Sequence, residues 1–257
     1  MATVKNKNVL AIGAHPDDME QFCGGTLKLI SDLEGYQVTI AALTSGECGS
    51  NELSPQEIIA IRKKESEEGA RKINANFINV GITDGSIEYN LETTRKIVAL
   101  IREVNPLIIF THPTEDYMTD HAHTGQLVLW AVPESTHKNF RVDTEASHLE
   151  KQPYVYHTDP QGLINKRGQI VEVNTIIDIT DVVEEKLEAL GAHESQIGLL
   201  QKGTAINAVE KTRRWAATRG QQIRRLYGEG FCQVLYEQYP RDNNLVKILG
   251  QEKVITL

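Results

Sequence analysis

Short apolar runs alternate with longer amphipathic stretches along the first half of the chain. Four of these runs, each bounded by polar residues, are typical of strands that a sheet buries on both faces: 8–14, 37–43, 76–80 and 107–111. Four longer stretches between and after them are predicted as helices: 24–33, 54–73, 91–104 and 121–131. This regular alternation of strand and helix predicts a doubly wound, mostly parallel sheet with helices on both faces, a Rossmann-like α/β fold.

The second half of the chain has a weaker pattern. It predicts strands at 154–157 and 175–179 and helices at 180–193 and 205–225. No stretch rich in glycine, proline or serine separates the two halves. We therefore expect residues 1–257 to form a single domain, a size that one α/β core supports.

Composition narrows the classes of function. The net charge is −8, which argues against nucleic acid as the main partner because phosphate binding needs a basic surface. No apolar run is long enough to span a bilayer, and the first eight residues are polar rather than an apolar leader. We expect a cytoplasmic protein with no membrane span, provided that no leader has been removed.

The three cysteines, Cys23, Cys48 and Cys232, are far apart and form no paired motif. Their odd number argues against a disulfide scaffold, and the absence of a Cys-x-x-Cys pair argues against a structural zinc knuckle. Any metal site must therefore use histidine and carboxylate ligands.

Two of the predicted strands end in clusters of residues that can bind metal. The first strand leads into His15-Pro16-Asp17-Asp18, and the fourth leads into a second cluster: His112, Glu115, Asp116, Asp120, His121 and His123. In an open parallel sheet, functional groups collect beyond the carboxyl ends of the strands. If both strands run in the same direction, residues about a hundred positions apart meet there.

Such a meeting suits a catalytic metal, which needs about three nitrogen or oxygen ligands and one open position for water. Neighbouring aspartates in an extended segment point in different directions, so one of Asp17 and Asp18 can bind the metal while the other acts as a base. The alternative is that His-Pro-Asp-Asp is only a turn in which an aspartate caps the next helix. The second cluster favours the metal site.

Several motifs resemble those of the LmbE-like, or PIG-L, de-N-acetylases. The segment AHPDDMEQFCGG is similar to the opening motif of that family, and DYMTDH is similar to its second metal motif. Further similarities occur between these two motifs, in the family's order: TSGECG, the pair Arg62 and Glu65, and Asp84-Gly85. The resemblance covers residues 8–130 strongly and the segments AHESQ and GEGF more weakly.

This resemblance implies a zinc-dependent de-N-acetylase, with an N-acetylated amino sugar or its conjugate as substrate. It implies that the metal ligands are His15, Asp18 and His121, and that Asp17 is the general base. Arg62, assisted by Asp84, would bind substrate hydroxyls, and Asp120 would assist catalysis from beside the ligands. Ferrous iron uses a similar set of two histidines and one carboxylate. Relatives of this type form homo-oligomers, and we expect the same here.

One position departs from the family pattern. Many members carry a histidine three residues before the last metal-binding histidine, where it helps to stabilise the oxyanion, but this chain has Met118. Either the metal takes over this task, or His112, His123 or Tyr117 replaces the missing side chain. His193 has two open interpretations, as an active-site residue or as a cation at a helix end. Two other functions stay open: hydrolysis of a different amide, and sugar binding or regulation without full activity.

Overall fold

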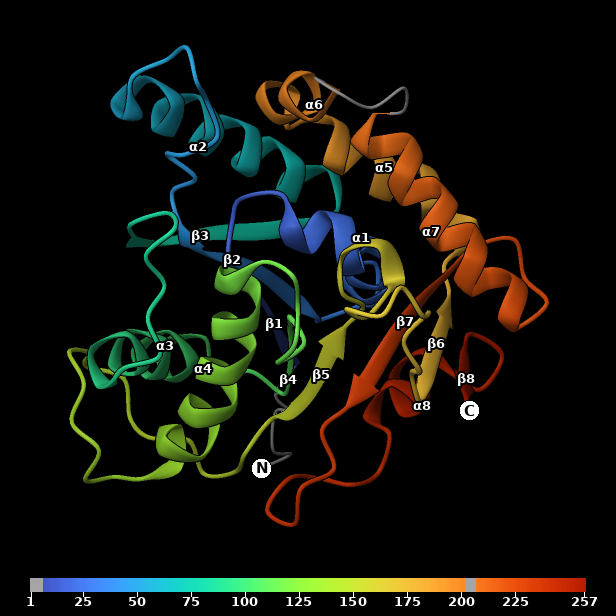
Figure 1. Cartoon of the computed structure of the whole chain (residues 1–257). Coiled ribbons are helices and arrows are strands. Elements are labelled where there is room, and N and C mark those ends of the chain that lie inside the picture. The colour runs from blue at the N-terminus through green and yellow to red at the C-terminus, as the bar shows by residue number, and fades with distance from the viewer. Residues whose placement is uncertain (1–6, 202–206) are drawn as a thin grey trace.

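An eight-stranded sheet forms the centre of the computed structural model, which describes residues 7–201 and 207–257 (Figure 1). Its strand order is β3-β2-β1-β4-β5-β7-β6-β8. The strands are β1 (Asn8–Gly13), β2 (Gln37–Thr44), β3 (Ala75–Ile82), β4 (Ile108–Thr111), β5 (Tyr154–Thr158), β6 (Thr175–Asp178), β7 (Gly228–Gln233) and β8 (Val254–Thr256).

The first five strands are parallel, and β7 and β8 are antiparallel to the neighbours with which they pair. The predicted Rossmann-like, mostly parallel sheet is therefore confirmed. The chain moves outwards from β1 to β2 and β3, then returns to place β4 on the other side of β1. In such sheets this reversal leaves a crevice beyond the carboxyl ends of the two central strands.

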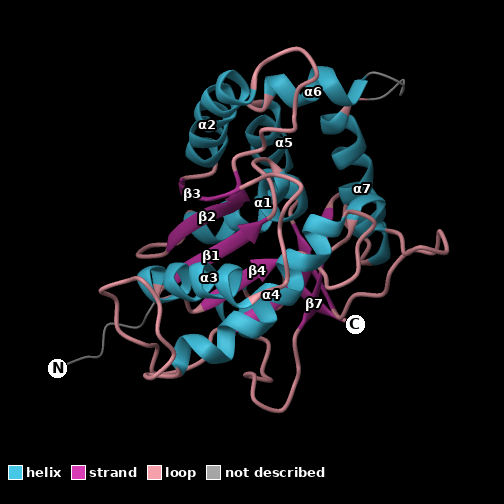
Figure 2. Cartoon of the chain, turned by 60° about the vertical axis from the view of Figure 1, so that its left-hand side comes forward, coloured by secondary structure: helices cyan, strands magenta, loops and turns pink. Residues whose placement is uncertain are grey.

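Helices cover both faces of the sheet (Figures 1 and 2). The α-helices are α1 (Asp18–Ser31), α2 (Pro55–Lys72), α3 (Leu91–Val104), α4 (Thr119–Thr136), α5 (Val183–Gly191), α6 (Glu194–Gln201), α7 (Ala208–Gln222) and α8 (Asn244–Leu249). Two short 3-10 helices are η1 (Gln161–Leu163) and η2 (Thr180–Val182). None of the helices in the described ranges combines the length and the apolar character needed to cross a membrane.

The central strand β1 contributes to the core on both of its faces. Val9 and Ala11 pack in the cluster that includes α1, α5 and α7, whereas Leu10 and Ile12 pack in the cluster that includes α3 and α4. All four side chains are fully buried. This double burial explains why the strand is a continuous apolar run rather than an alternating one.

Some predicted boundaries are wrong. The first helix begins at Asp18 rather than at residue 24, so Asp18 does not belong to an extended segment. The predicted helix 180–193 consists of η2 and α5 and ends at Gly191. The predicted helix 205–225 corresponds to α7, and its first two residues lie outside the described ranges. Strands β7 and β8 and helices α6 and α8 were not predicted.

A buried ion pair holds α1 against the second half of the chain. The Lys186 ammonium lies 2.5 Å from Glu229 Oε1 and donates to the carbonyl of Gln21. The Glu229 carboxylate accepts hydrogen bonds from the backbone N–H groups of Gly25 and Thr26, at 2.9 and 2.7 Å. Lys186 thus bonds to the first turn, and Glu229 to the middle, of the helix whose first residue is Asp18, which fixes that helix.

Replacing one member of this pair should be costly. The K186M variant would leave the Glu229 carboxylate buried without its cation, and we expect the free energy of unfolding to fall by about 3–5 kcal/mol. Urea denaturation of the full chain measures the change. The matched control is E184Q, which breaks the exposed Arg213–Glu184 pair and should have little effect. Equal losses in the two variants would contradict the role assigned to the buried pair.

Candidate metal centre

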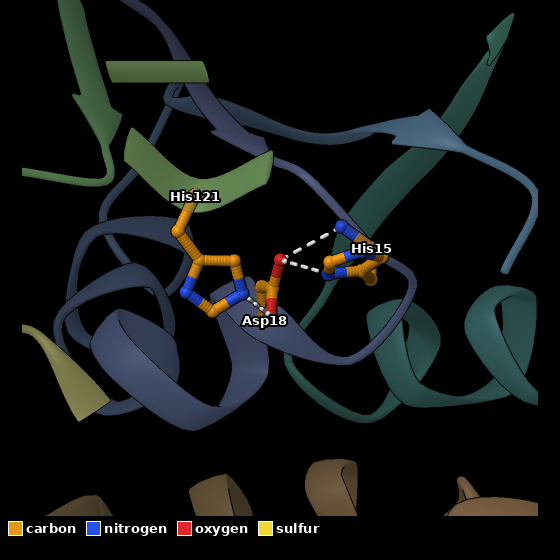
Figure 3. A group of neighbouring side chains, drawn as sticks. All are labelled: His15, Asp18 and His121. Atoms are coloured by element: carbon orange, nitrogen blue, oxygen red, sulfur yellow. Dashed lines mark hydrogen bonds and ion pairs between the residues drawn. The ribbon is translucent and has the colours of Figure 1, made fainter. Parts of the chain in front are cut away.

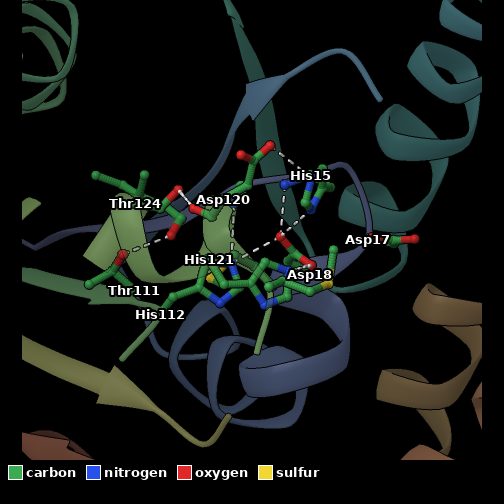
Figure 4. A network of polar contacts seen from close by, with 12 residues as sticks. His15, Asp17, Asp18, Thr111, His112, Asp120, His121 and Thr124 are labelled. Atoms are coloured by element: carbon green, nitrogen blue, oxygen red, sulfur yellow. Dashed lines mark hydrogen bonds and ion pairs between the residues drawn. The ribbon is translucent and has the colours of Figure 1, made fainter. Parts of the chain in front are cut away.

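The side chains of the site come from the segments that follow β1 and β4, including the first turns of α1 and α4. His15 follows β1, and Asp18 is the first residue of α1. Between them, Asp17 adopts a left-handed backbone conformation, with φ 103°. For a residue with a Cβ atom this conformation is strained, and it turns the Asp17 side chain away from that of Asp18 (Figure 4). The two carboxylates diverge because of this sharp turn, not because of an extended backbone.

Two glycines allow the loops and helices to approach closely. A Cβ atom on Gly13 would lie 2.9 Å from the Asp18 Cβ, so a larger residue would push Asp18 away from the end of β1. A Cβ atom on Gly125 in α4 would lie 2.5 Å from the carbonyl oxygen of His112 and 2.6 Å from that of Pro113. The absence of both side chains lets the start of α1 lie close to the end of β1 and lets α4, which carries His121, lie close to the segment after β4.

His15, Asp18 and His121 meet at this point (Figure 3). Each offers one ligand atom, and the three atoms lie within 4.8 Å of one another. His121 Nε2 lies 3.3 Å from Asp18 Oδ1, and His15 Nδ1 lies 3.6 Å from Asp18 Oδ2. The side chains are 2–12 % exposed, so this group is almost shielded from solvent. The structure therefore brings the three predicted ligands together.

The electrostatics of the group favour a bound cation. Burial lowers the pKa of His15, but Asp120, Asp18 and Asp84 outweigh it and raise this pKa to about 12. Burial also lowers the pKa of His121, but Asp18 and Asp116 outweigh this effect and raise the pKa to about 9. Burial disfavours the Asp18 anion, yet the adjacent imidazoles hold its pKa well below the usual value. Carboxylates that hold protons on two buried imidazoles can hold a metal ion in their place.

Unsatisfied atoms lead to the same conclusion. Both ring nitrogens of His121 are buried, and within the described part of the chain neither makes a hydrogen bond of good geometry, although Asp18 lies 3.3 Å from Nε2 and Asp116 lies 3.5 Å from Nδ1. Buried polar atoms are normally satisfied, so such a ring points to a missing partner. A metal ion between His15, Asp18 and His121 would supply that partner. The donor set, two imidazoles and one carboxylate, suits zinc and also ferrous iron.

Further carboxylates orient the two imidazoles. Asp120 Oδ2 lies 3.5 Å from His15 Nε2 (Figure 4). Asp84 Oδ1 lies 3.2 Å from the same atom. Asp116 Oδ2 lies 3.5 Å from His121 Nδ1. Metal-binding histidines commonly direct their second ring nitrogen to a carboxylate, which fixes the tautomer and the orientation of the ring. Asp84 and Asp120 therefore contact a candidate ligand directly. A second candidate group of His15, Asp84 and Asp120 overlaps with the first.

Arg62 braces the loops around Asp17. The residue is 3 % exposed, and its guanidinium donates to the carbonyl oxygens of Pro16 and Gly46. Arg62 Nη2 also lies 3.2 Å from Asp17 Oδ2. Burial raises the pKa of Asp17, and the charge of Arg62 acts in the opposite direction. The predicted substrate-binding arginine thus contacts the predicted base, and its role toward substrate stays a prediction.

The remaining histidines lie in different surroundings. His112 is fully buried and stacks on His121, with ring centroids 3.9 Å apart, and its Nε2 lies 2.9 Å from Asp18 Oδ2. Burial and the adjacent His121 lower the pKa of His112 to about 4. His123 Nδ1 lies 2.5 Å from the carbonyl oxygen of Ile87, so His123 faces away from the centre. His193 is buried beside Glu20, with Nε2 3.4 Å from Oε1.

The sequence does not predict the contacts that Asp116 and His112 make in this site. Asp116 was included in the second cluster, but the spacing gave no sign that its carboxylate reaches His121 Nδ1. His112 was weighed only as a substitute for the histidine missing at Met118, whereas the structure places it against Asp18 and beneath His121. Its position directly after a buried strand was the available signal.

Fold and site together define an α/β protein with a candidate metal centre at the switch point of its sheet. Residues 10–132 match the family described as GlcNAc-PI de-N-acetylase (PIG-L). The chain is 30 % identical over 207 residues to a Bacillus cereus protein described as a probable N-acetyl-α-D-glucosaminyl L-malate deacetylase 2. The alignment covers 77 % of this chain and 87 % of that protein. The chain belongs to the PIG-L, or LmbE-like, family.

Solved structures agree with this family. N,N′-diacetylchitobiose deacetylase from Pyrococcus horikoshii is similar with a TM-score of 0.77 and 29 % identity, over 92 % of this chain and 88 % of that one. GalB, the 4-carboxy-2-hydroxymuconate hydratase from Pseudomonas putida, has a TM-score of 0.76 at 22 % identity, over 92 % of this chain and 98 % of that one. The second similarity shows the fold alone.

Removing a ligand of the candidate centre should abolish tight zinc binding. We expect H121A to weaken zinc binding at least about 100-fold, because only one imidazole and one carboxylate of the set remain. Competition with a chromophoric chelator measures the affinity. The matched control is H123A, which changes a histidine of the same helix that faces a backbone carbonyl, and it should bind zinc like the wild type. Unchanged affinity in H121A would remove the site from consideration.

Proposed function

We propose that this protein is a zinc-dependent deacetylase that hydrolyses the acetamido group of an N-acetylglucosaminyl-type sugar or conjugate. The observation that carries the proposal is the meeting of His15, Asp18 and His121 at the switch point of the sheet. The family supports an amide-hydrolysing enzyme, and the Bacillus cereus and Pyrococcus horikoshii relatives are named as deacetylases of this chemical type. The products would be acetate and a free amine.

His15, Asp18 and His121 would hold the metal. When bound, zinc polarises an amide carbonyl and lowers the pKa of water. Asp84 and Asp120 would keep a proton on His15 Nε2, which leaves the Nδ1 that faces Asp18 free to bind the metal. Asp116 would act in the same way on His121 Nδ1.

Asp17 would handle the protons. Its carboxylate is 19 % exposed, and it precedes a ligand without belonging to the ligand group. Burial favours its neutral form and Arg62 favours its anion, which is the balance a general base needs if it is to take a proton and later return it to the leaving amine. Arg62 would hold Asp17 and the Gly46 loop in place and assist with substrate hydroxyls.

Met118 supports a second candidate function. Where family members carry a histidine, Met118 is the N-cap residue of α4 and provides no side-chain hydrogen bond to that helix end. A thioether cannot donate a proton to an oxyanion. The chain would then act on a different amide, or bind a sugar without full turnover. Zinc as the metal in the cell, a homo-oligomeric state and a cytoplasmic location stay predictions of this proposal.

The central test is release of acetate by the zinc-loaded wild type from N-acetylglucosamine conjugates, compared with a panel of other amides. The D17N variant should lower kcat by about 10²–10⁴-fold, because an amide cannot accept the proton of the attacking water. Zinc content measured on the same samples should not change.

Two outcomes would contradict this proposal. Full activity in D17N with zinc bound would remove Asp17 as the base. A zinc-loaded wild type that releases acetate from no amino sugar would favour the second candidate function. Cleavage of other amides would then identify a different hydrolase. The absence of any cleavage would identify a sugar-binding protein. The control D181N changes an exposed aspartate that pairs with Lys253, and it should behave like the wild type.

A further inference from the structure

An exposed aromatic ring lies beside the candidate metal centre. Tyr117 is 75 % exposed, the highest value among the large apolar side chains that are exposed in the described part of the chain. It lies on the loop between β4 and α4, directly after Asp116, whose carboxylate contacts His121. The ring is therefore close to the centre while most of its surface faces solvent.

Contacts with a second loop hold this ring in place. The Tyr117 hydroxyl donates to Gln161 Oε1 at 3.3 Å, and Asp116 Oδ2 accepts from the Gln161 backbone N–H at 3.4 Å. Asp116 Oδ1 also accepts from the N–H of Met118 at 2.9 Å, so the loop is fixed on both sides of Tyr117. Exposed tyrosines without such contacts are free to rotate. Here the hydroxyl is tethered, while 75 % of the residue is exposed.

The second loop also carries exposed apolar side chains. Three residues beyond Gln161, Ile164 is 44 % exposed, and it pairs with Ile170, which is 51 % exposed. Single exposed apolar side chains are ordinary, but Tyr117 differs from the others because its hydroxyl is held by Gln161 and the neighbouring Asp116 contacts His121 of the candidate centre. Tyrosine suits such a surface because it offers a large, rigid contact area at low cost in conformational entropy.

We propose that the Tyr117 ring is a platform for a second ring of the substrate, a sugar attached to the acetamido sugar that is hydrolysed. This proposal rests on the proposed deacetylase function and extends it to disaccharides and ring-bearing conjugates. A pyranose ring presents C–H groups on its faces and hydroxyls on its rim. The exposed phenyl ring would cover the C–H groups, and the nearby Gln161 amide would be available to the hydroxyls.

Tyr117 would act in binding and not in the reaction. Its hydroxyl is already donated to Gln161, so the ring and not the hydroxyl is the open group. Loss of the ring should therefore raise KM for a substrate that covers it and leave kcat unchanged. A substrate with only one sugar ring would not reach the platform and should not be affected.

The experiment compares four forms of the zinc-loaded chain: wild type, Y117F, Y117A and Y236A. Tyr236 is a matched control because it is 66 % exposed and follows β7, which runs antiparallel to β5 and so leads to the opposite end of the sheet. Acetate release is measured with N-acetylglucosamine and with N,N′-diacetylchitobiose. In Y117A we expect KM for the disaccharide to rise about tenfold, with KM for the monosaccharide unchanged. Y117F should retain the platform, and Y236A should match the wild type.

Three results would overturn the platform: equal effects of Y117A on both sugars, no effect on either, or a loss in Y117F as large as in Y117A. A wild type that hydrolyses neither sugar would contradict the proposed function, and a second measurement then decides on Tyr117. Saturation-transfer NMR with the D17N protein detects disaccharide binding without turnover. Disaccharide binding by D17N that is lost in the double variant D17N/Y117A would support the platform. Disaccharide binding that is absent in D17N, or unchanged in the double variant, would overturn it.

Discussion

The Asp18 carboxylate is the contact on which the rest of this site depends. Its Oδ2 accepts the backbone N–H of His15 at 2.7 Å and lies 2.9 Å from His112 Nε2, while Oδ1 faces His121. One side chain thus connects the end of β1 with the end of β4, two strands whose residues are about a hundred positions apart in sequence. An anion buried this deeply is stable only when cations or strong donors surround it. Asp18 therefore favours positive charge at the meeting point of the loops.

The scaffold around Asp18 restricts its position from several directions. Gly13 and Gly125 let β1, α1 and α4 approach one another, and the Lys186–Glu229 pair fixes α1 two turns beyond Asp18. The left-handed backbone at Asp17 is the strained element of this arrangement. Strain of this kind persists where the surrounding contacts determine the geometry, and such places are often functional sites. Here it separates a carboxylate that belongs to the ligand group from one that faces Arg62.

Much of the first half of the fold could be predicted from sequence because its strands are buried on both faces. Such strands are continuous apolar runs, as in β1, and the helices between them carry clear signals, such as the Ser54–Glu57 capping box. Strand β7 was missed because GEGFCQ has two glycines and a charged residue, and its strand geometry depends on pairing with β5 and β6. The sequence predicts the first helix from Gly24, whereas Gly24 and Gly25 are buried inside a helix that begins at Asp18.

The candidate site divides in the same way. Motifs identified His15, Asp18 and His121, and the parallel direction of β1 and β4 explains why they meet. Contacts such as Asp116 with His121 and Asp84 with His15 depend on loop conformations that leave no periodic pattern in a sequence.

Diffraction from zinc-soaked crystals, with anomalous data on both sides of the zinc absorption edge, tests the central claim most directly. The account predicts one strong peak at about 2.0–2.2 Å from ligand atoms of His15, Asp18 and His121. Zinc bound elsewhere, with these three side chains free of metal, would contradict it.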